Sequence, residues 1–578
     1  MCGIVGIISK EPFSVRERLV KALKRLEYRG YDSCGYATGR GDFVKKIGEI
    51  SGLMSAPKES QATLGIAHTR WATHGGVTEA NAHPHFNKEK TIFVVHNGII
   101  ENYAEIRRLL VEQGYEFVSQ TDTEVIPHYI DWRLKLGRSM EESMQDFISL
   151  AEGTFAVVMF RKGEEMLYVM KRDSPLVLGV VDGMCIIASD IYAFSDLTRE
   201  AVFFEDNEYA CIGPGSYTIF NARGKQVHRL MQPFDWTHNE ETKEKYRHFM
   251  MKEIREQPVT SKRLIDSFKT TQKSKLETLA SMVREAERVV FLACGTSYHA
   301  SLVGAFLMTK QGIRANSVIA SEFESFLIVD NKTLVIAISQ SGETMDVVSV
   351  LKHVRKTGAK VACIVNVPYS TVQRMSDISI ELLAGQEVCV AATKTFTNQL
   401  IALLALAKAL GNKEIHLEEI PARIAQTIVD NEEILKKLAK ELHKKHDIFV
   451  LGRGMTYPLA REFALKLKEI PYMHAEGMMA GELKHGTIAL IEPGTPVISL
   501  IPNSNPDMIS STKEVEARGA KTIIISNTNG ELHLPACCDA EFGIYSGIVG
   551  HLLSYYIGLL RKCPIDKPRN LAKSVTVK

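Results

Sequence analysis

The sequence lacks several features that mark specialised classes of protein. Its ten cysteines include no paired CxxC spacing, which argues against a zinc site, and a chain of 578 residues with scattered cysteines does not predict a disulfide framework. The formal net charge is only +2, which gives no electrostatic footprint for nucleic acid. Neither G-x-x-x-x-G-K-[ST] nor a G-x-G-x-x-G that follows a strand is present. We therefore expect no metal, nucleotide or redox cofactor.

Long hydrophobic runs are also missing. The start, MCGIVGIISKEP, has no basic region and is interrupted by Pro12, which is typical of a buried strand rather than a signal peptide. The apolar stretches around 400–410 and 548–560 carry Lys408 and His551, and we expect them to be too short to span a bilayer. The sequence predicts a cytoplasmic protein with reduced thiols.

The length predicts several domains, because single hydrophobic cores stop growing near about 250–300 residues. Short apolar runs with turn signals fill the first part, with helices expected at 15–26 and 101–113, which favours a layered α/β sandwich. A polar stretch then precedes strands that alternate with long helices, the pattern of parallel βαβ units. The predicted divisions are a first domain at 2–230, a linker at 231–245, two lobes at 246–425 and 426–565, and a tail at 566–578.

The second half repeats itself. RVVFLACGTSYHA at 288–300 resembles DIFVLGRGMTYPLA at 447–460, and TLVIAISQSGETMDVV at 333–348 has its counterpart in TPVISLIPNSNPDMI at 495–509. Each copy combines an apolar strand, a turn and a helix. Two similar doubly wound lobes with parallel sheets are the simplest interpretation.

Cys2 directly follows the initiator methionine. Removal of Met1 would leave a thiol and a free α-amine on one residue, and the amine, with a reference pKa near about 7.7–8.0, could take the thiol proton. This is the arrangement of N-terminal nucleophiles. The alternative for a lone Cys2 is a small buried residue near a chain start.

Other segments supply the remaining parts of an amide-cleaving site. AHTRWATHG places Arg70, Thr73 and His74 in one loop, where the guanidinium could hold an amino acid carboxylate. Asp122 could pair with the α-ammonium, and Asn97 with the N–H of Gly98 could hold an oxyanion. Alone, Asp122 could equally be a helix cap and the Asn-Gly pair a hairpin turn.

SQSGET at 339–344 ends an apolar strand and opens a helix. Three hydroxyls, a glycine and a helix N-terminus favour a phosphate, and the absence of a lysine favours a sugar monophosphate over a nucleotide. Ordinary N-capping is the alternative for any one of these hydroxyls.

The motifs MCGIVGI, LEYRGYDS, AHTRWATHG, NAHPH, VVHNGIIEN and TDTEV together resemble the glutamine–fructose-6-phosphate aminotransferase (isomerising) family, also called glucosamine-6-phosphate synthases. The resemblance implies an N-terminal nucleophile (Ntn) domain with four αββα layers, followed by two doubly wound sugar isomerase (SIS) lobes. It implies transfer of ammonia from L-glutamine to D-fructose 6-phosphate through a channel, as the first step of amino-sugar synthesis, in a homodimer.

The resemblance also implies roles for individual residues. In the first domain Cys2 would be the nucleophile, Asn97 and Gly98 the oxyanion hole, Trp71 a gate over the ammonia route and Arg29 part of the surrounding loops. The residues that would bind glutamine are Arg70, Thr73, His74, His83 and Asp122.

For the sugar half the resemblance implies that Glu469 moves a proton between C1 and C2, that His485 of a neighbouring subunit opens the ring, and that Lys466 is a supporting cation. Lys573 would form a Schiff base at C2. Contacts to the sugar phosphate would come from Thr296, Ser339, Gln340, Ser341, Thr344, Val390 and, through its backbone, Ala572. Ala392 stands where many relatives have serine. Without the resemblance, a solvated helix surface would explain Lys466 and Glu469, and a solvent charge would explain Lys573.

Three other functions remain open at this point. An amidotransferase with another acceptor, such as a phosphoribosyl donor, would not need SQSGET or the PRNLAK tail. A sugar-phosphate sensor without turnover would need an effector module, which the sequence lacks. A stand-alone ketose-amine lyase or isomerase would have no use for Cys2.

We predict that Cys2→Ala abolishes the use of glutamine and leaves isomerisation of fructose 6-phosphate detectable, because the thiol acts only on the amide. Glutamate release and hexose 6-phosphate interconversion measure the two activities separately. Full glutaminase activity in Cys2→Ala would disprove the nucleophile assignment.

Overall fold

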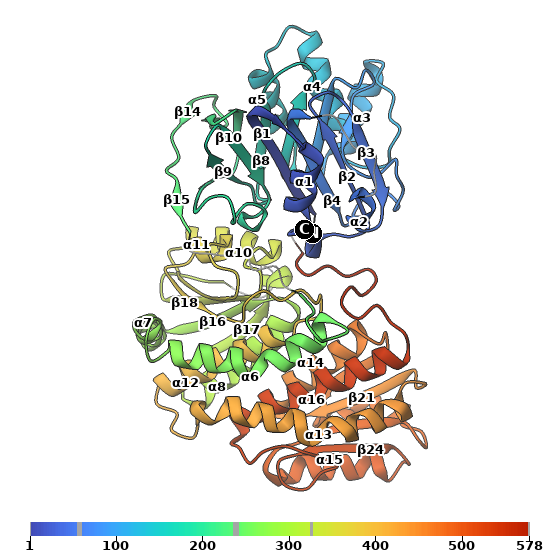
Figure 1. Ribbon diagram of the computed structural model, residues 1–578. Coiled ribbons are helices and arrows are strands. Elements are labelled where there is room, and N and C mark those ends of the chain that lie inside the picture. Colours follow the sequence, from blue (N-terminus) through green and yellow to red (C-terminus); the bar gives the residue numbers. More distant parts are fainter. Residues whose placement is uncertain (1, 55–60, 235–241, 324–327, 576–578) are drawn as a thin grey trace. The chain divides into compact units, whose positions relative to one another are not determined.

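The computed structural model describes residues 2–54, 61–234, 242–323 and 328–575 (Figure 1). The chain forms two compact units, the first comprising Met1–Glu240 with Ala572–Lys578 and the second comprising Glu241–Leu571. Residues 235–241 of the predicted linker lie outside the described residues. Because the segment from Ala572 belongs to the first unit, the predicted tail 566–578 is divided between the two units.

Two antiparallel sheets build the first unit. The inner strands are rich in apolar residues and are buried on both faces, and every position of β1 from Gly3 to Ile8 lies inside. The first sheet has the order β15 (Gln232–Pro233), β11 (Glu200–Phe203), β9 (Val177–Val181), β10 (Met184–Ala188), β1 (Gly3–Phe13), β4 (Ala62–Arg70), β2 (Ser33–Thr38) and β3 (Phe43–Ile47). The second has the order β14 (Gln226–Val227), β13 (Ser216–Phe220), β12 (Glu208–Gly213), β8 (Leu167–Arg172), β7 (Gly153–Arg161), β6 (Ile92–Ile100) and β5 (His85–Phe86).

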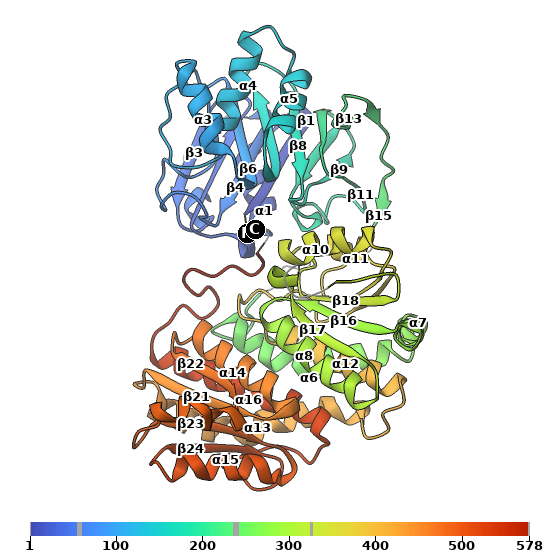
Figure 2. The same cartoon turned by 180° about the vertical axis from the view of Figure 1, so that it is seen from behind.

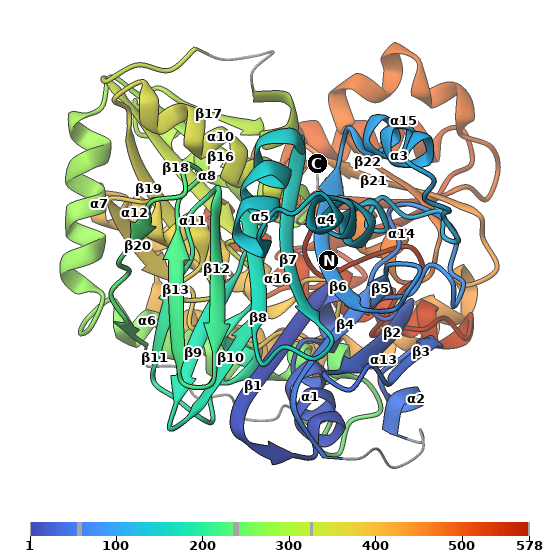
Figure 3. The same cartoon turned by 90° about the horizontal axis from the view of Figure 1, so that it is seen from above.

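Helices cover the outer faces of both sheets. Helix α1 (Val15–Lys24) places Val15, Leu19 and Leu23 in one buried stripe against β1 and β4. On the other side lie α3 (Tyr103–Glu112), α4 (Val125–Lys135) and α5 (Met140–Leu150), which pack on the second sheet (Figure 3). One apolar cluster lies between the sheets and a second lies beneath α3–α5, so the unit has four αββα layers. The helices predicted at 15–26 and 101–113 are confirmed.

The second unit contains two parallel sheets of the same topology (Figure 2). In each, the first two strands exchange places and the others follow in sequence, giving the doubly wound order 2-1-3-4-5. The first sheet has the order β17 (Ala315–Ile319), β16 (Arg288–Ala293), β18 (Thr333–Ser339), β19 (Lys360–Val365) and β20 (Ile378–Glu381). The second has the order β22 (His474–Met479), β21 (Asp447–Gly452), β23 (Pro496–Ile501), β24 (Lys521–Ser526) and β25 (Leu532–His533). The duplication predicted from the sequence is confirmed.

The two lobes share one apolar core, to which both sheets and the intervening helices contribute. These helices are α6 (Phe249–Ser267), α7 (Lys273–Glu285), α8 (Gly295–Lys310), α12 (Lys394–Ala409), α13 (Ile420–Leu442), α14 (Tyr457–Glu469) and α16 (Asp539–Leu560). The buried apolar residues of α10 (Met345–Lys356) and α11 (Thr371–Arg374) belong to a separate cluster with the first sheet, and those of α15 (Pro506–Glu516) to another with the second sheet. The predicted lobe boundary at 425/426 falls inside α13, because the chain passes between the lobes as one continuous helix. We therefore propose α13 as the connection between them.

Helix α16 corrects one prediction. The stretch 548–560 is part of a helix that begins at Asp539, so that its length and composition would allow it to cross a membrane. However, 83% of its apolar stretch is buried inside the protein, where it packs against α13 and α14. α16 is therefore a core helix of the kind that soluble proteins contain.

Gly477 on β22 sets the distance between this strand and α14. A Cβ atom at Gly477 would lie 2.3 Å from the carbonyl oxygen of Ala460 and 2.5 Å from the Cα of Arg461. Because these are backbone atoms of the helix, no rotamer change could relieve the overlap.

We predict that Gly477→Ala lowers the free energy of unfolding by about 1–3 kcal/mol, the usual cost of overpacking a closely packed interior. The matched control is Gly481→Ala, whose added Cβ would meet only the mobile end of Arg453, at 3.3 Å. Urea unfolding of both variants measures the difference, and an equal loss in the control would contradict the steric explanation.

Candidate active sites

The Cys2 thiol lies at the start of β1, beside the loop that follows β4. Its Sγ accepts a hydrogen bond from the backbone N–H of Trp71 at 3.2 Å and lies 3.5 Å from the carbonyl oxygen of Trp71. The loop is fixed by Asp32, whose carboxylate accepts from the N–H of Ala72 at 2.8 Å. Burial raises the pKa of the thiol, and Arg70 acts in the opposite direction. A base close to the sulfur is therefore needed to form the thiolate.

Asn97 and Gly98 lie beside Cys2 at the end of β6. The Asn97 amide donates from Nδ2 to the carbonyl oxygen of Cys2 at 2.9 Å. Gly98 has a φ of 122°, and a Cβ there would lie 2.0 Å from the carbonyl oxygen of Thr154 on β7. Only glycine fits this position. The hairpin-turn alternative is wrong, because both residues belong to a strand paired with β7.

Arg70 is buried and shapes the loop that follows it. Its guanidinium donates to the carbonyl oxygens of His74 at 2.5 Å, Gly75 at 3.3 Å and Gly76 at 3.2 Å. The loop thereby wraps around the cation. Thr73 is exposed on it, and the His74 ring lies edge-on to Tyr103 at 5.6 Å. A carboxylate-binding role for Arg70 stays a prediction.

Asp122 is buried and accepts a hydrogen bond from the N–H of Ile100 at 2.8 Å, at the end of the strand that carries Asn97. Arg29 is also buried and forms an ion pair with Asp190. It donates to the carbonyl oxygen of Ser189 at 3.4 Å, just after β10. The position of Arg29 therefore agrees with a loop-supporting role, and Asp122 is joined to the strand that carries Asn97 and Gly98.

Four buried histidines, His68, His83, His85 and His96, lie near these residues. Of the four, only His83 was predicted to bind glutamine. The rings of His68 and His83 stack at 4.0 Å, and His83 meets His85 edge-on at 4.7 Å. The hydroxyl of Thr123 lies 3.1 Å from Nε2 of His83 and 2.9 Å from Nδ1 of His96. Burial lowers the pKa of His68 to about 3 and lowers the pKa values of His83, His85 and His96 as well.

In the second unit, helix α14 carries a buried ionic cluster. Lys466 forms ion pairs with Glu469 and, at 3.4 Å, with Glu462, and it donates to the hydroxyl of Thr296 at 3.2 Å. Nδ1 of His299 lies 2.8 Å from Glu462. The side chain of Lys466 is only 1% exposed and that of Glu462 only 2%. The alternative of a solvated helix surface is therefore wrong for Lys466.

The charges in this cluster support one another. Burial alone would lower the pKa of Lys466, but Glu462 and Glu469 outweigh burial and raise it above its ordinary value. Burial would raise the pKa of Glu462, but Lys466 and His299 hold it below its ordinary value. Both groups are therefore charged at neutral pH. The cluster can position a carboxylate, that of Glu469, whose side chain is 19% exposed and is paired with the buried Lys466.

Sequence reasoning missed Glu462, His299 and His551. The spacing of Glu462, Lys466 and Glu469 is i, i+4, i+7, which places three charges on one helix face and could have indicated the cluster. His551 lies on α16 next to Phe396, fully buried, and burial lowers its pKa to about 4. Nothing in the apolar pattern of α16 pointed to it.

The SQSGET segment forms a cradle where β18 ends and α10 begins. Gly342 has a φ of 65° and donates its N–H to Oγ of Ser339 at 3.0 Å, while the N–H of Glu343 donates to Oγ of Ser341 at 3.1 Å. Ser339 and Thr344 bring their hydroxyls within 3.3 Å. Hydroxyls and N–H groups thus converge at a helix N-terminus, as a phosphate requires.

The remaining predicted residues are less closely joined. The N–H of Val390 donates to the carbonyl oxygen of Asp566 at 3.1 Å, so the first residue of the predicted tail lies against it. His485 is exposed at the end of the turn after β22, and the half-buried Gln340 precedes the cradle hydroxyls. Ala572 and Lys573 belong to the first unit, whereas the other predicted sugar residues belong to the second.

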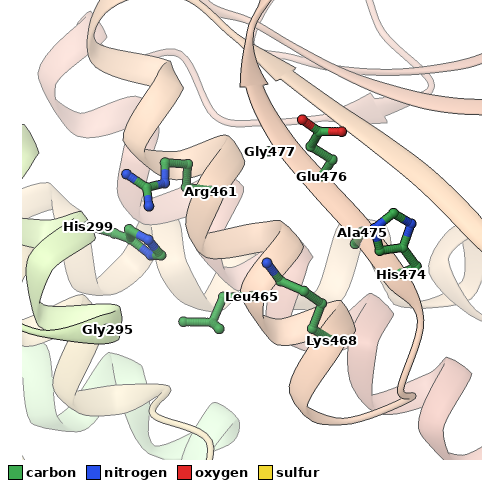
Figure 4. Close-up of a pocket in the computed structure, with 9 residues that line it drawn as sticks. All are labelled: Gly295, His299, Arg461, Leu465, Lys468, His474, Ala475, Glu476 and Gly477. Carbon is green, nitrogen blue, oxygen red and sulfur yellow. The ribbon is translucent and has the colours of Figure 1, made fainter. Parts of the chain in front are cut away.

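A cavity of about 420 Å³ lies along the neighbouring face of α14 (Figure 4). Arg461, Leu465 and Lys468 line it from the helix, at positions that directly flank the buried cluster. The strand residues 474–477 and His299 of α8 complete the lining. Helix α14 therefore presents one face to the ionic cluster and an adjacent face to an open cavity.

We predict that the protein loses stability as the pH falls below about 6.5, the reference pKa of histidine. Below this pH the unfolded chain binds protons at His68, His83, His85 and His96, whereas these side chains stay neutral in the folded chain because their pKa values are depressed. Each proton bound only by the unfolded chain lowers the free energy of unfolding by about 1.4 kcal/mol per pH unit.

Urea unfolding between pH 7.5 and pH 5, in steps of about half a unit, measures this slope. His85→Gln is expected to make it shallower, whereas His228→Gln, at an exposed position of the same unit, leaves it unchanged. A wild-type slope that is flat below pH 6.5 would show that the four histidines are protonated in the folded state.

Comparisons with known proteins agree with this division of the chain. Residues 68–196 match the glutamine amidotransferase domain family, and residues 282–409 and 441–532 match the SIS domain family. Glutamine–fructose-6-phosphate aminotransferase (isomerizing) from Thermococcus kodakarensis is 41% identical, and that from Clostridium tetani is 40% identical, with 100% of each chain covered in both cases.

A solved structure supports the assignment of the second unit. The C-terminal domain of glucosamine-fructose-6-phosphate aminotransferase from Francisella tularensis is 33% identical, with a TM-score of 0.52. The match covers all of that domain and 57% of this chain. With an Ntn-type αββα glutaminase domain and two SIS lobes, the chain belongs to the glutamine–fructose-6-phosphate aminotransferase (isomerizing) family.

Proposed function

We propose that the protein transfers the amide nitrogen of L-glutamine to D-fructose 6-phosphate and releases D-glucosamine 6-phosphate and L-glutamate. The observation that carries this proposal is the 41% identity over the entire chain to a glutamine–fructose-6-phosphate aminotransferase. Identity over the entire chain matters because each half of the reaction needs its own domain. As in the relatives' name, the reaction combines amino transfer with a ketose-to-aldose isomerisation.

The first half-reaction is assigned to the Cys2 site. The sulfur forms a bond to the side-chain amide carbon of glutamine, and the electron pair of the C=O bond moves to the oxygen. The α-amine of Cys2 takes the thiol proton and passes it to the leaving nitrogen, which departs as ammonia when the C=O bond re-forms. Water then hydrolyses the thioester to glutamate. Nδ2 of Asn97 and the N–H of Gly98 would stabilise the oxyanion.

The second half-reaction is assigned to the SQSGET cradle and the α14 cluster. The cradle hydroxyls and Thr296 would bind the sugar phosphate, and Lys573 would trap C2 as a Schiff base with loss of water. Ammonia then displaces the lysine amine at C2. Glu469, held by Lys466, would move the proton from C1 to C2 that converts the ketose imine into the amino aldose.

Ammonia has to reach the sugar without becoming ammonium, which lacks a nucleophilic lone pair. We propose that it travels within the protein under Trp71, because exclusion of water prevents its protonation. We also propose a cytoplasmic homodimer in which His485 of one subunit opens the sugar ring of the other. The exposed position of His485 supports only the proposed sharing between subunits.

The test of the proposed function is glucosamine 6-phosphate formation by the wild-type enzyme and by Lys573→Ala. We expect wild-type glutamate release to be coupled to the amino sugar when both substrates are present. Lys573→Ala should lose amino-sugar formation by at least about 10²-fold, since no amine remains to trap C2, and should keep basal glutamine hydrolysis.

Lys562→Ala, at an exposed lysine before the tail, is the control and should behave as the wild type. Absence of glucosamine 6-phosphate with the wild-type enzyme would refute the transferase proposal. Loss of both activities in Lys573→Ala would refute its assignment to the sugar alone.

A further inference from the structure

His68 is a buried residue of β4 for which the reaction described above has no task. Its Nε2 lies 3.0 Å from the carbonyl oxygen of His96 and 3.1 Å from Oδ1 of Asn97. A backbone carbonyl oxygen can only accept a hydrogen bond, so Nε2 carries the hydrogen. The Asn97 atom that faces Nε2 must then also be an acceptor, the amide oxygen.

The other end of the same amide is fixed by an independent contact. The nitrogen Nδ2 of Asn97 donates to the carbonyl oxygen of Cys2 at 2.9 Å, and that oxygen is again an acceptor only. Both contacts therefore select one of the two nearly isosteric orientations of the amide. In the opposite orientation the amide oxygen would face the position of a developing oxyanion and repel it.

The contact between His68 and Asn97 joins the two sheets of the first unit. His68 lies on β4, opposite Ile4 of the neighbouring strand β1, which begins directly after Cys2. Asn97 lies on β6 of the second sheet, opposite Ala156. The nucleophile and His68 thus belong to one sheet and the oxyanion donor to the other, so this hydrogen bond sets the amide relative to the thiol.

We propose that His68 is a positioning residue for glutamine cleavage, which orients the Asn97 amide so that Nδ2 donates to the oxyanion formed at Cys2. This inference rests on the glutaminase half of the proposed function. Burial keeps the imidazole neutral, and its Nδ1 has no hydrogen-bond partner in the described part of the chain. Its single hydrogen is therefore committed to the two oxygens at Nε2.

The test compares four full-length variants in basal glutamine hydrolysis: His68→Leu, His68→Gln, Asn97→Ala and the double variant His68→Leu/Asn97→Ala. Loss of an oxyanion donor typically lowers kcat by about 10²–10³-fold. We expect His68→Leu to lower kcat by about tenfold to hundredfold with little change in KM, because the donor is misoriented rather than absent. His68→Gln, whose amide nitrogen reaches the position of Nε2, should restore most of the activity.

The double variant separates positioning from a general structural effect. If His68 acts through Asn97, adding His68→Leu to Asn97→Ala should change kcat by less than about twofold. Multiplication of the two single losses would overturn the inference, as would equal losses in His68→Leu and His68→Gln.

Alkylation of Cys2 by iodoacetamide provides a readout that needs no oxyanion hole. His68→Leu should react at the wild-type rate, which shows an intact thiol and fold. A parallel fall in alkylation would mean that His68 acts on the thiol, and the inference would be wrong. A wild-type enzyme that hydrolyses glutamine without forming glucosamine 6-phosphate would refute the transferase proposal and leave this inference standing.

Discussion

Both candidate sites depend on polar side chains that are held away from water and must find partners inside the protein. Lys466 is the clearest case, because an isolated buried ammonium would be far too costly and only Glu462 and Glu469 make its charge tolerable. Those partners lie on α14 itself, each about one turn from the lysine, one on either side. The helix must therefore keep its face toward α8, whose Thr296 and His299 complete the cluster. The close approach of α14 to Gly477 serves this requirement.

The two units meet this constraint in different ways. The first unit buries neutral imidazoles, whose pKa values are depressed, near the Cys2 thiol, whose pKa burial raises. In the proposed reaction a negative charge would appear there only when the oxyanion forms, and neutral donors could stabilise it without attracting a counter-ion beforehand. The second unit buries permanent charges of both signs. The proposed proton transfer beside a carbonyl would need a carboxylate in place before the substrate arrives, and Lys466 forms an ion pair with that of Glu469.

Much of the fold could be predicted from the sequence. The strand runs, the helices at the start, the duplicated lobes and the cradle after β18 all follow from apolar periodicity and turn chemistry, which are local signals. The strand order of the sheets is not local, since it depends on which edges pair in three dimensions. The same holds for the tail, which is divided between units, and for α16, whose start at Asp539 lies beyond the most apolar stretch.

The candidate sites were predicted unevenly for the same reason. Cys2, Asn97 and Gly98 come from separate segments, and the structure brings them together because β1 and β6 belong to facing sheets. His68, His85 and His96 occur within the quoted motifs, yet their burial and mutual stacking cannot be read from single positions. Arg70 was predicted to bind a carboxylate. In the structure its guanidinium donates hydrogen bonds to the carbonyl oxygens of its own loop, which no sequence motif indicates.

The duplication of the lobes explains where the candidate sugar half-site lies. Helices α8 and α14 are equivalent elements, since each follows the first strand of its sheet after a glycine with positive φ, Gly295 and Gly454. They pack against each other across the shared core, so the two copies meet at corresponding faces.

After duplication, such a junction is free to diverge, because only one copy needs to supply each group. The first lobe retains the hydroxyl cradle on β18, whereas the second carries Asn503 and Ser504, both with positive φ, at the equivalent position after β23. Helix α14 carries the charged residues Glu462, Lys466 and Glu469, whereas α8 contributes Thr296 and His299 to the same cluster. The candidate site thus combines side chains from two lobes of the same topology, the hydroxyl cradle from the first and the charged residues of α14 from the second.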